Sequence, residues 1–135
     1  MSTMKLVRNC LLAILFLGAL GKPLIASETI TTGTYTNLRM SAQTGDLNGY
    51  EIRLLLSSDG YVSVVQMSEG GPGIVTLQPV RIQGKQIVID FSNHRYGLIK
   101  FEGSVNRDQI NGVFTFDRGG ADSVVLRRGK SYWER

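Results

Sequence analysis

The segment from Ile99 to Phe116, IKFEGSVNRDQINGVFTF, decides the fold because its two halves mirror each other about one turn. Apolar residues and glycines alternate with polar residues in both halves, which is typical of paired strands with one buried and one solvated face. With residues 106–109 as the loop, the opposed pairs are Val105 with Ile110, Gly103 with Gly112, Phe101 with Phe114 and Ile99 with Phe116. The pattern predicts an antiparallel hairpin whose glycine pair lets the sheet bend sharply or close.

The rest of the chain reads as further short strands separated by polar, glycine-rich turns. Pro79 predicts a bulge or a sheet edge within one of these strands. The other expected strands are Thr34 to Met40, Tyr50 to Leu56, Tyr61 to about Ser68, roughly Val75 to Ile82, Gln86 to Phe91 and Ser123 to Arg128. We predict an all-β chain, a single antiparallel meander of about eight strands closed as a small up-and-down barrel. A two-sheet sandwich is the alternative.

The overall plan resembles the calycin group of small β-barrels, the lipocalins and avidins. Those families open their first strand with a Gly-x-Trp motif, whose ring is covered by an arginine from the last strand. The matching residues here are Gly33-Thr34-Tyr35 and Arg127 or Arg128, with tyrosine in place of tryptophan. The resemblance implies a secreted barrel, and it specifies no ligand.

The N-terminal segment has the pattern of a cleaved signal peptide. Lys5 and Arg8 precede an apolar run from Leu11 to Leu20, and small residues follow near Ala26. A run of this length falls short of the roughly twenty residues of a membrane-spanning helix. We therefore expect residues 1–26 to be removed, residues 27–135 to form one domain, and the product to be periplasmic or secreted. Cys10 is the only cysteine, so this domain would contain none.

The net charge argues against a nucleic acid partner, and the strand lengths argue against a membrane-spanning barrel. Three of the 15 Lys and Arg residues lie in the first 26 positions, so twelve remain against 11 Asp and Glu. A net charge of about +1 lacks the positive field that sequence-independent phosphate binding needs, and we expect no nucleic acid partner. The expected strands are also shorter than the nine to eleven residues that cross a bilayer, which argues against an integral membrane barrel.

A candidate binding site follows from the alternating direction of the strands in the meander, which decides which loops share an end. The longer loops, at 41–49, 69–73, 92–95 and 118–122, fall at one end, which we call the long-loop end, and the short turns fall at the other. Aromatic and thioether side chains with inward parity lie where the strands begin or end there, and basic or histidine side chains come from the adjacent loops. The predicted ligand-binding residues are Tyr50, Met67, Phe91, His94, Arg95, Phe116 and Arg118. The simpler alternative is that the apolar members only complete the core. Tyr96 also falls at this end, but its parity points it outward unless a bulge at Leu98-Ile99 reverses its face.

Catalytic patterns are missing from the sequence. His94 is the only histidine, which rules out a histidine metal cluster, and no nucleophile or phosphate-loop motif occurs. The turn carboxylates are expected at different ends of the barrel, so they form no acid and base pair. We predict no enzymatic activity, no metal and no cofactor.

Two functions from different classes remain. The first is an exported barrel that binds a small apolar or amphipathic molecule at the long-loop end. The second is a protein-interaction module, such as an inhibitor or an envelope-assembly factor, with a filled interior. Leu55, Val62 and Val64 favour the second because they face outward on neighbouring strands, where they would allow binding to a partner or oligomerisation. In the C-terminal segment, Tyr132 and Trp133 are expected to pack over the short-turn end, and the alternative is that residues 130–135 form a basic and aromatic patch for a partner.

Overall fold

The hairpin register predicted from the sequence is confirmed. The computed structural model of the chain describes residue 30 and residues 32–134, and in it β8 (Gly97–Val105) and β9 (Gln109–Phe116) pair antiparallel. All the expected pairs are opposed, from Val105 with Ile110 to Ile99 with Phe116. A slip of one residue would have moved every apolar side chain to the solvent face, so the alternation specifies this register.

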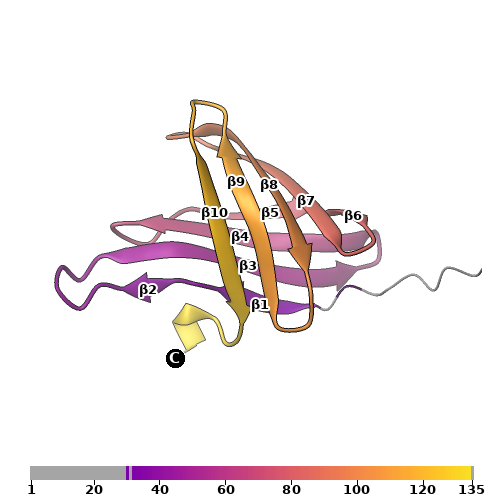
Figure 1. The fold of residues 1–135 in the computed structure, drawn as a ribbon, viewed down its shortest axis with the longest axis horizontal. Coiled ribbons are helices and arrows are strands. Elements are labelled where there is room, and N and C mark those ends of the chain that lie inside the picture. Colours follow the sequence, from indigo (N-terminus) through magenta and orange to yellow (C-terminus); the bar gives the residue numbers. More distant parts are fainter. Residues whose placement is uncertain (1–29, 31, 135) are drawn as a thin grey trace, which may run out of the picture.

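The strands form one antiparallel sheet. Besides β8 and β9, its members are β1 (Gly33–Thr36), β2 (Arg39–Met40), β3 (Leu47–Ser57), β4 (Gly60–Glu69), β5 (Val75–Pro79), β6 (Arg81–Gln83), β7 (Gln86–Asn93) and β10 (Ala121–Arg128). The order is β5-β4-β3-β1-β10-β9-β8-β7-β6, and β2 pairs with β3 beside this path. The first strand, β1, pairs with β3 on one side and with the last strand, β10, on the other. The sheet curls back on itself (Figure 1). The predicted all-β meander is confirmed as a sheet that is nearly closed into a barrel.

The barrel stays unclosed where one expected strand is split in two. We predicted a continuous strand over roughly Val75 to Ile82, but β5 pairs with β4 whereas β6 pairs with β7. Pro79 is the reason, because it has no backbone N–H to donate and it ends β5. The next residue, Val80, still donates to the carbonyl of Tyr61 at 3.0 Å, and the chain then crosses to β7. The sequence prediction of an edge at Pro79 therefore locates the seam.

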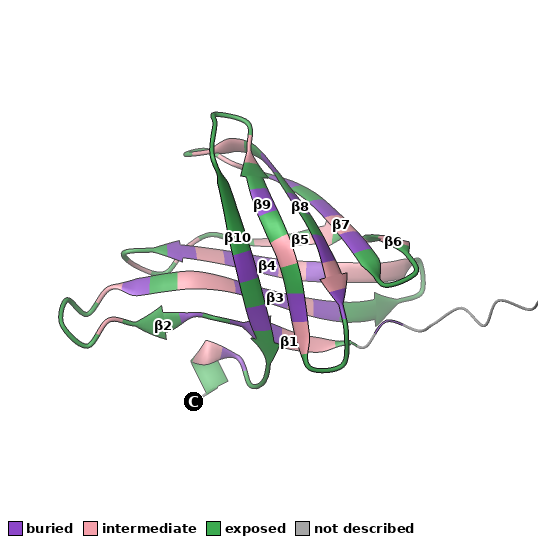
Figure 2. Cartoon of the chain, viewed as in Figure 1, coloured by how far each residue is buried: buried purple, intermediate pink, exposed green. Residues whose placement is uncertain are grey.

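The core is filled by aromatic rings at the level of the glycine pair. Phe101 and Phe114 are fully buried, with ring centroids 4.6 Å apart. A Cβ atom on Gly103 would lie 2.7 Å from Cζ of Phe101, and one on Gly112 would also collide with that ring. The space that the two glycines leave is thus occupied by Phe101. Along β8 the buried and exposed residues alternate, as the colours in Figure 2 show.

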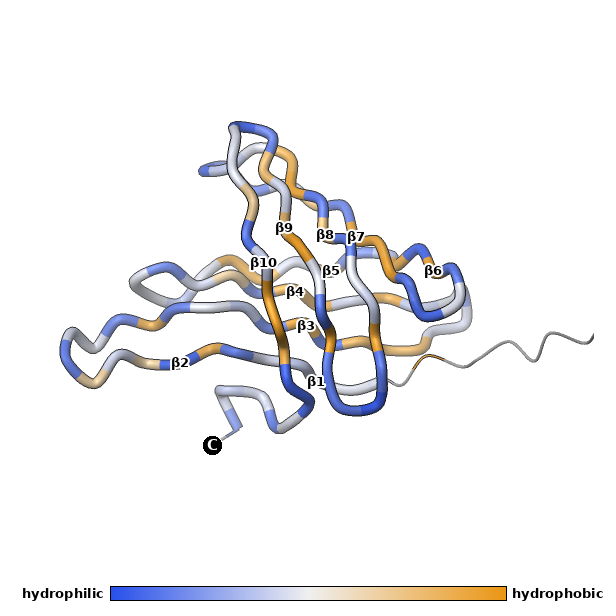
Figure 3. The backbone as a smooth tube through the Cα atoms, viewed as in Figure 1, coloured by the Kyte–Doolittle hydropathy of each residue, from blue (hydrophilic) through white to orange (hydrophobic). Residues whose placement is uncertain are grey.

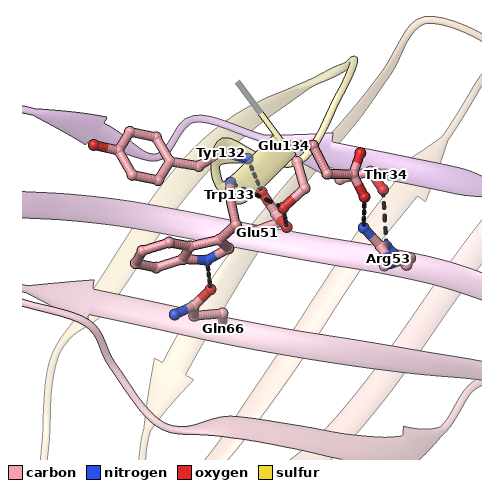
Figure 4. A network of polar contacts seen from close by, with 8 residues as sticks. Thr34, Glu51, Arg53, Gln66, Tyr132, Trp133 and Glu134 are labelled. Atoms are coloured by element: carbon pink, nitrogen blue, oxygen red, sulfur yellow. Dashed lines mark hydrogen bonds and ion pairs between the residues drawn. The ribbon is translucent and has the colours of Figure 1, made fainter.

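The C-terminal segment lies on the outer wall of the barrel, so the prediction that it covers the short-turn end is wrong. Ser131 Oγ donates to Glu51 Oε1 at 2.6 Å, and the backbone N–H of Tyr132 donates to Glu51 Oε2 at 3.0 Å. Trp133 Nε1 donates to Gln66 Oε1 at 2.7 Å (Figure 4). Glu51 faces outward as its parity predicts, but this segment buries it.

Outward-facing apolar residues run across β3, β4 and β5. Leu55 is opposed to Val62, and Val64 is opposed to Leu77, so these four side chains share one face of the sheet. Leu55 is 40% exposed and Leu77 is 65% exposed. Figure 3 shows hydrophobic stretches along β3 and β4. We call Leu55, Val62, Val64 and Leu77 the apolar wall.

The predicted signal peptide and its cleavage site near Ala26 lie outside the described residues. Export therefore stays a prediction. Within residues 30 and 32–134, the structure contains no helix with the length and apolar character needed to cross a membrane.

Candidate functional site

A cavity of about 740 Å³ lies at the long-loop end of the barrel. Its wall is made by the ends of β3, β4 and β9, by the start of β10 and by the loops that follow β4, β7 and β9. Five of the predicted ligand-binding residues line it, namely Tyr50, Met67, His94, Arg95 and Phe116. The alternating strand direction of the meander therefore places residues from four separate segments of the sequence around one cavity.

The other two predicted residues do not line this cavity. Phe91 is buried, and its ring meets the ring of Phe114 edge-on with centroids 6.3 Å apart. It completes the core, as the simpler alternative proposed. Arg118 points away to the neighbouring loop, where its Nη1 donates to the backbone carbonyl of Arg95 at 2.8 Å. Arg118 thus holds the β7–β8 loop in place beside the cavity.

The floor of the cavity is aromatic and lies directly on the filled core. Tyr50 stacks on Phe114 with ring centroids 4.4 Å apart and an angle of 14° between the ring planes. Phe114 in turn contacts Phe101, which fills the centre of the barrel. A ligand at this end would therefore rest on Tyr50 at the mouth and would not enter the interior.

Tyr50 is linked to the opposite wall through its hydroxyl group. The Tyr50 hydroxyl donates a hydrogen bond to the carboxylate of Asp122, near the start of β10. Burial raises the pKa of the Tyr50 phenol above its ordinary value of 10.0, and the hydrogen bond and negative charge of Asp122 raise it further. The negative charge of Glu69 acts in the same direction. The phenol is therefore a neutral donor at any physiological pH, and two carboxylates lie near it.

Tyr96 belongs to the cavity lining, so the prediction that it points outward is wrong. Strand parity does not apply to it, because it lies in the turn before β8 and is followed by Gly97 with a φ of 74°. Its ring packs against Phe116 with centroids 5.3 Å apart, and its hydroxyl donates to the carboxylate of Glu69. A glycine directly after a loop tyrosine was the sequence signal that the strand had not yet begun.

Glu69 also carries the ion pair of the site. Arg95 Nη1 lies 3.1 Å from Glu69 Oε2, and the Arg95 guanidinium lies 5.2 Å from the centroid of the Tyr96 ring. Arg95 and Glu69 are both largely exposed, so this pair contributes little to stability. The ion pair does, however, balance the positive charge of Arg95 with the negative charge of Glu69 at the rim of the cavity.

Glycine-rich loops shape the rest of the mouth. Gly73 approaches the carbonyl of Met67 so closely that no Cβ atom would fit there, and its N–H donates to Ser68 Oγ at 3.3 Å. The loop after β4 is therefore folded back over the end of that strand. Gly119 and Gly120 line the other side, with φ values of 101° and 99° that favour glycine.

The site provides binding surfaces, and no metal centre is formed by the described residues. Within residues 30 and 32–134, no group of three or more His, Cys, Asp or Glu side chains is placed to hold a metal ion. His94 is exposed at the rim. The lining combines apolar rings, a thioether and a few oriented polar groups, which is the usual composition of a small-molecule site.

Comparison of the chain with family models, with curated proteins and with solved structures gave no match. The calycin resemblance rested on Gly33-Thr34-Tyr35 and on Arg127 or Arg128, and the structure places Tyr35 opposite Arg128 between β1 and β10. Arg128 Nη2 donates to the carbonyl of Thr32 at 2.9 Å, which ties the start of β1 to the end of β10. A relationship to calycins stays a prediction.

Proposed function

We propose that this protein is an exported, non-enzymatic β-barrel that binds a small apolar or amphipathic molecule at its long-loop end. The observation that carries the proposal is the cavity of about 740 Å³ above Tyr50. Small-molecule sites typically measure about 300 to 1,000 Å³. The cavity is therefore large enough for a molecule of the size of a short-chain lipid or a small aromatic compound.

The arrangement of apolar and polar groups supports an amphipathic ligand. Tyr50, Met67 and Phe116 offer apolar surface, whereas Glu69, Arg95 and Asp122 lie in the same lining. Each of these charged groups already has a polar partner, since Glu69 binds Arg95 and Tyr96 and Asp122 binds Tyr50. Groups held in this way orient a ligand, but they form no nucleophile and base pair, which supports a non-enzymatic role.

A neutral fluorescent probe tests this function directly. Nile red should gain fluorescence with the parent protein, and Phe116→Ala should weaken its binding about tenfold. That change corresponds to roughly 55 Å² of lost apolar contact at about 25 cal/mol per Å². The matched control is Val125→Ala, which removes an exposed apolar residue from the outer wall of β10. Equal binding by the parent, Phe116→Ala and Val125→Ala, or no binding by the parent, would contradict the proposal.

A protein-interaction role is the second candidate, and the apolar wall favours it. Leu55 and Leu77 are exposed together with the partly exposed Val62 and Val64, and β5 is an end strand of the sheet. Contiguous exposed apolar surface of this kind marks interfaces in many proteins. If a second copy binds there, sedimentation should show a dimer that Val64→Lys returns to monomer. A monomer with bound Nile red would leave the binding barrel as the function.

Export is proposed from the pattern of the first 26 residues alone. Lys5 and Arg8 before the apolar run from Leu11 to Leu20 support it. Intact mass measurement of protein from cells should show the loss of about 26 residues. A product that keeps Met1 would contradict cleavage.

A further inference from the structure

We propose that the ligand of the long-loop cavity carries a cationic head group, such as an alkylammonium, which the aromatic lining and Asp122 would hold. This inference rests on the proposed function, because it names the chemical class of the molecule that the cavity binds.

The first observation is the aromatic lining. Tyr50, Tyr96 and Phe116 all line the cavity, and the rings of Tyr96 and Phe116 pack together at 5.3 Å. The negative faces of aromatic rings attract cations, and sites for quaternary ammonium groups are commonly built from such rings. Both tyrosine hydroxyls donate to carboxylates, which makes the rings richer in electrons. Arg95 already lies over the ring of Tyr96, so the rings of Tyr50 and Phe116 are the ones that would favour a cation over a neutral group of equal size.

The second observation is the balance of charge around the cavity. Among the charged residues of the lining, the positive charge of Arg95 is matched by Glu69 at 3.1 Å. Asp122 accepts a hydrogen bond from Tyr50, and no Lys, Arg or His of residues 32–134 forms an ion pair with it. Among residues 32–134, Asp122 thus contributes a negative charge that no ion pair neutralises.

The third observation is the position of Arg118, which was predicted to bind the ligand. Arg118 does not line the cavity, and its guanidinium donates to the backbone carbonyl of Arg95. An anionic ligand would therefore meet the carboxylates of Asp122 and Glu69, and the arginine of the lining, Arg95, is already paired with Glu69. The charge of the lining selects against fatty acids and other carboxylates.

Three probes with the same alkyl chain separate the possibilities. Decyltrimethylammonium, decanol and decanoate should each compete with Nile red below their aggregation concentrations at pH 7.4. We expect the cation to bind at least tenfold more tightly than decanoate, with decanol between them. Raising the salt concentration from 50 to 500 mM should weaken the cation and leave decanol unchanged, because salt screens charge.

Charge-removing variants test the role assigned to Asp122. Asp122→Asn keeps the shape and an acceptor for the Tyr50 hydroxyl, so the affinity for decyltrimethylammonium, measured relative to the affinity for decanol, should fall about tenfold. Asp59→Asn is the matched control, because Asp59 is exposed in the turn between β3 and β4 at the opposite end. Glu69→Gln gives a second test, since it leaves Arg95 unmatched and should shift the preference toward decanoate.

The outcomes are distinguishable. If the parent protein does not bind Nile red, the proposed function fails and this inference fails with it. If Nile red binds but decanoate competes as well as decyltrimethylammonium, the binding barrel stands and the cationic ligand is overturned. Equal loss of cation binding in Asp122→Asn and Asp59→Asn would also overturn it, because the effect would then reflect net charge alone.

Discussion

Each end of the barrel contains an inward-facing tyrosine, but one tyrosine is fully buried and the other lies next to a cavity. At the short-turn end Tyr35 is fully buried, and its hydroxyl donates to the carbonyl of Asn106 at 3.3 Å. At the long-loop end Tyr50 is half-buried beneath a cavity, and its hydroxyl reaches Asp122. One tyrosine closes the barrel and the other forms the floor of a site.

Loop length explains the difference. The turn between β3 and β4 has only two residues between Ser57 and Gly60, which are paired, so the strands at that end stay together. At the other end the glycine-rich loops at 70–73 and 117–120 leave the strand ends apart, and the cavity forms between them. Short turns thus keep the strands paired at one end, and longer loops leave room for a cavity at the other.

The largest expected effect is on the core that both ends share. Phe101→Ala should lower the free energy of unfolding by roughly 3 to 5 kcal/mol, because the ring is fully buried. Its neighbour Lys100 points to solvent, so Lys100→Ala should change stability by less than about 0.5 kcal/mol. Urea denaturation of both variants measures the difference. Similar losses at the two positions would mean that the buried and exposed faces of β8 are wrongly assigned.

A smaller loss is expected when a side chain is added beside Phe101. Gly112→Val should destabilise the protein by roughly 1 to 3 kcal/mol, because the new atoms would collide with the Phe101 ring. Gly129→Val is the control, since nothing lies within 4 Å of a Cβ atom there. Thermal unfolding of the pair tests whether the ring fills the space left by the glycines. A stable Gly112→Val variant would show that Phe101 can move aside.

The hairpin and the barrel could be predicted because strand alternation is a local property. Each residue from Ile99 to Phe116 shows its face through its own polarity and that of its neighbours. The order of loops along a meander then fixes which loops share an end, and this placed Tyr50, Met67 and Phe116 together.

What the sequence did not predict depends on contacts between distant residues. Parity placed Glu51 on the solvent face, but burial of Glu51 depends on Ser131, which lies 80 positions away. Tyr96 was misassigned because the strand begins one residue later than its parity assumed, at Gly97. Pro79 predicted a sheet edge, but the sequence did not predict that the segment before it pairs with β4 and the segment after it pairs with β7.

The rim should be less sensitive to truncation than the core. Phe116 is only partly buried, so Phe116→Ala should cost roughly 1.5 to 2.5 kcal/mol, about half of the loss at Phe101. Chemical denaturation of the two variants under the same conditions gives the comparison. A loss at Phe116 equal to that at Phe101 would mean that the long-loop end closes the core instead of forming a site.

The smallest expected effect compares the two tyrosines in alkaline solution. Burial raises the pKa of Tyr35 and Tyr50 above 10.0 in the folded protein. At Tyr35 the positive charge of Arg128 opposes the rise and the negative charge of Asp108 adds a smaller increase, whereas at Tyr50 Asp122 adds to the rise. A raised pKa means that the folded state keeps the phenol proton after the unfolded state has lost it. The stability from each neutral phenol is therefore fully present below about pH 10 and is lost as the pH rises further.

The loss of stability above pH 10 should be shallower in Tyr50→Phe than in the parent, because this variant lacks the phenol whose pKa two carboxylates raise. Tyr35→Phe should flatten it less, since the positive charge of Arg128 favours ionisation at that end. Urea denaturation at pH 8, 10 and 11 measures both variants against the parent. If Tyr35→Phe flattens the curve as much as Tyr50→Phe, the carboxylates at the cavity do not act on Tyr50, and the electrostatic difference between the two ends disappears.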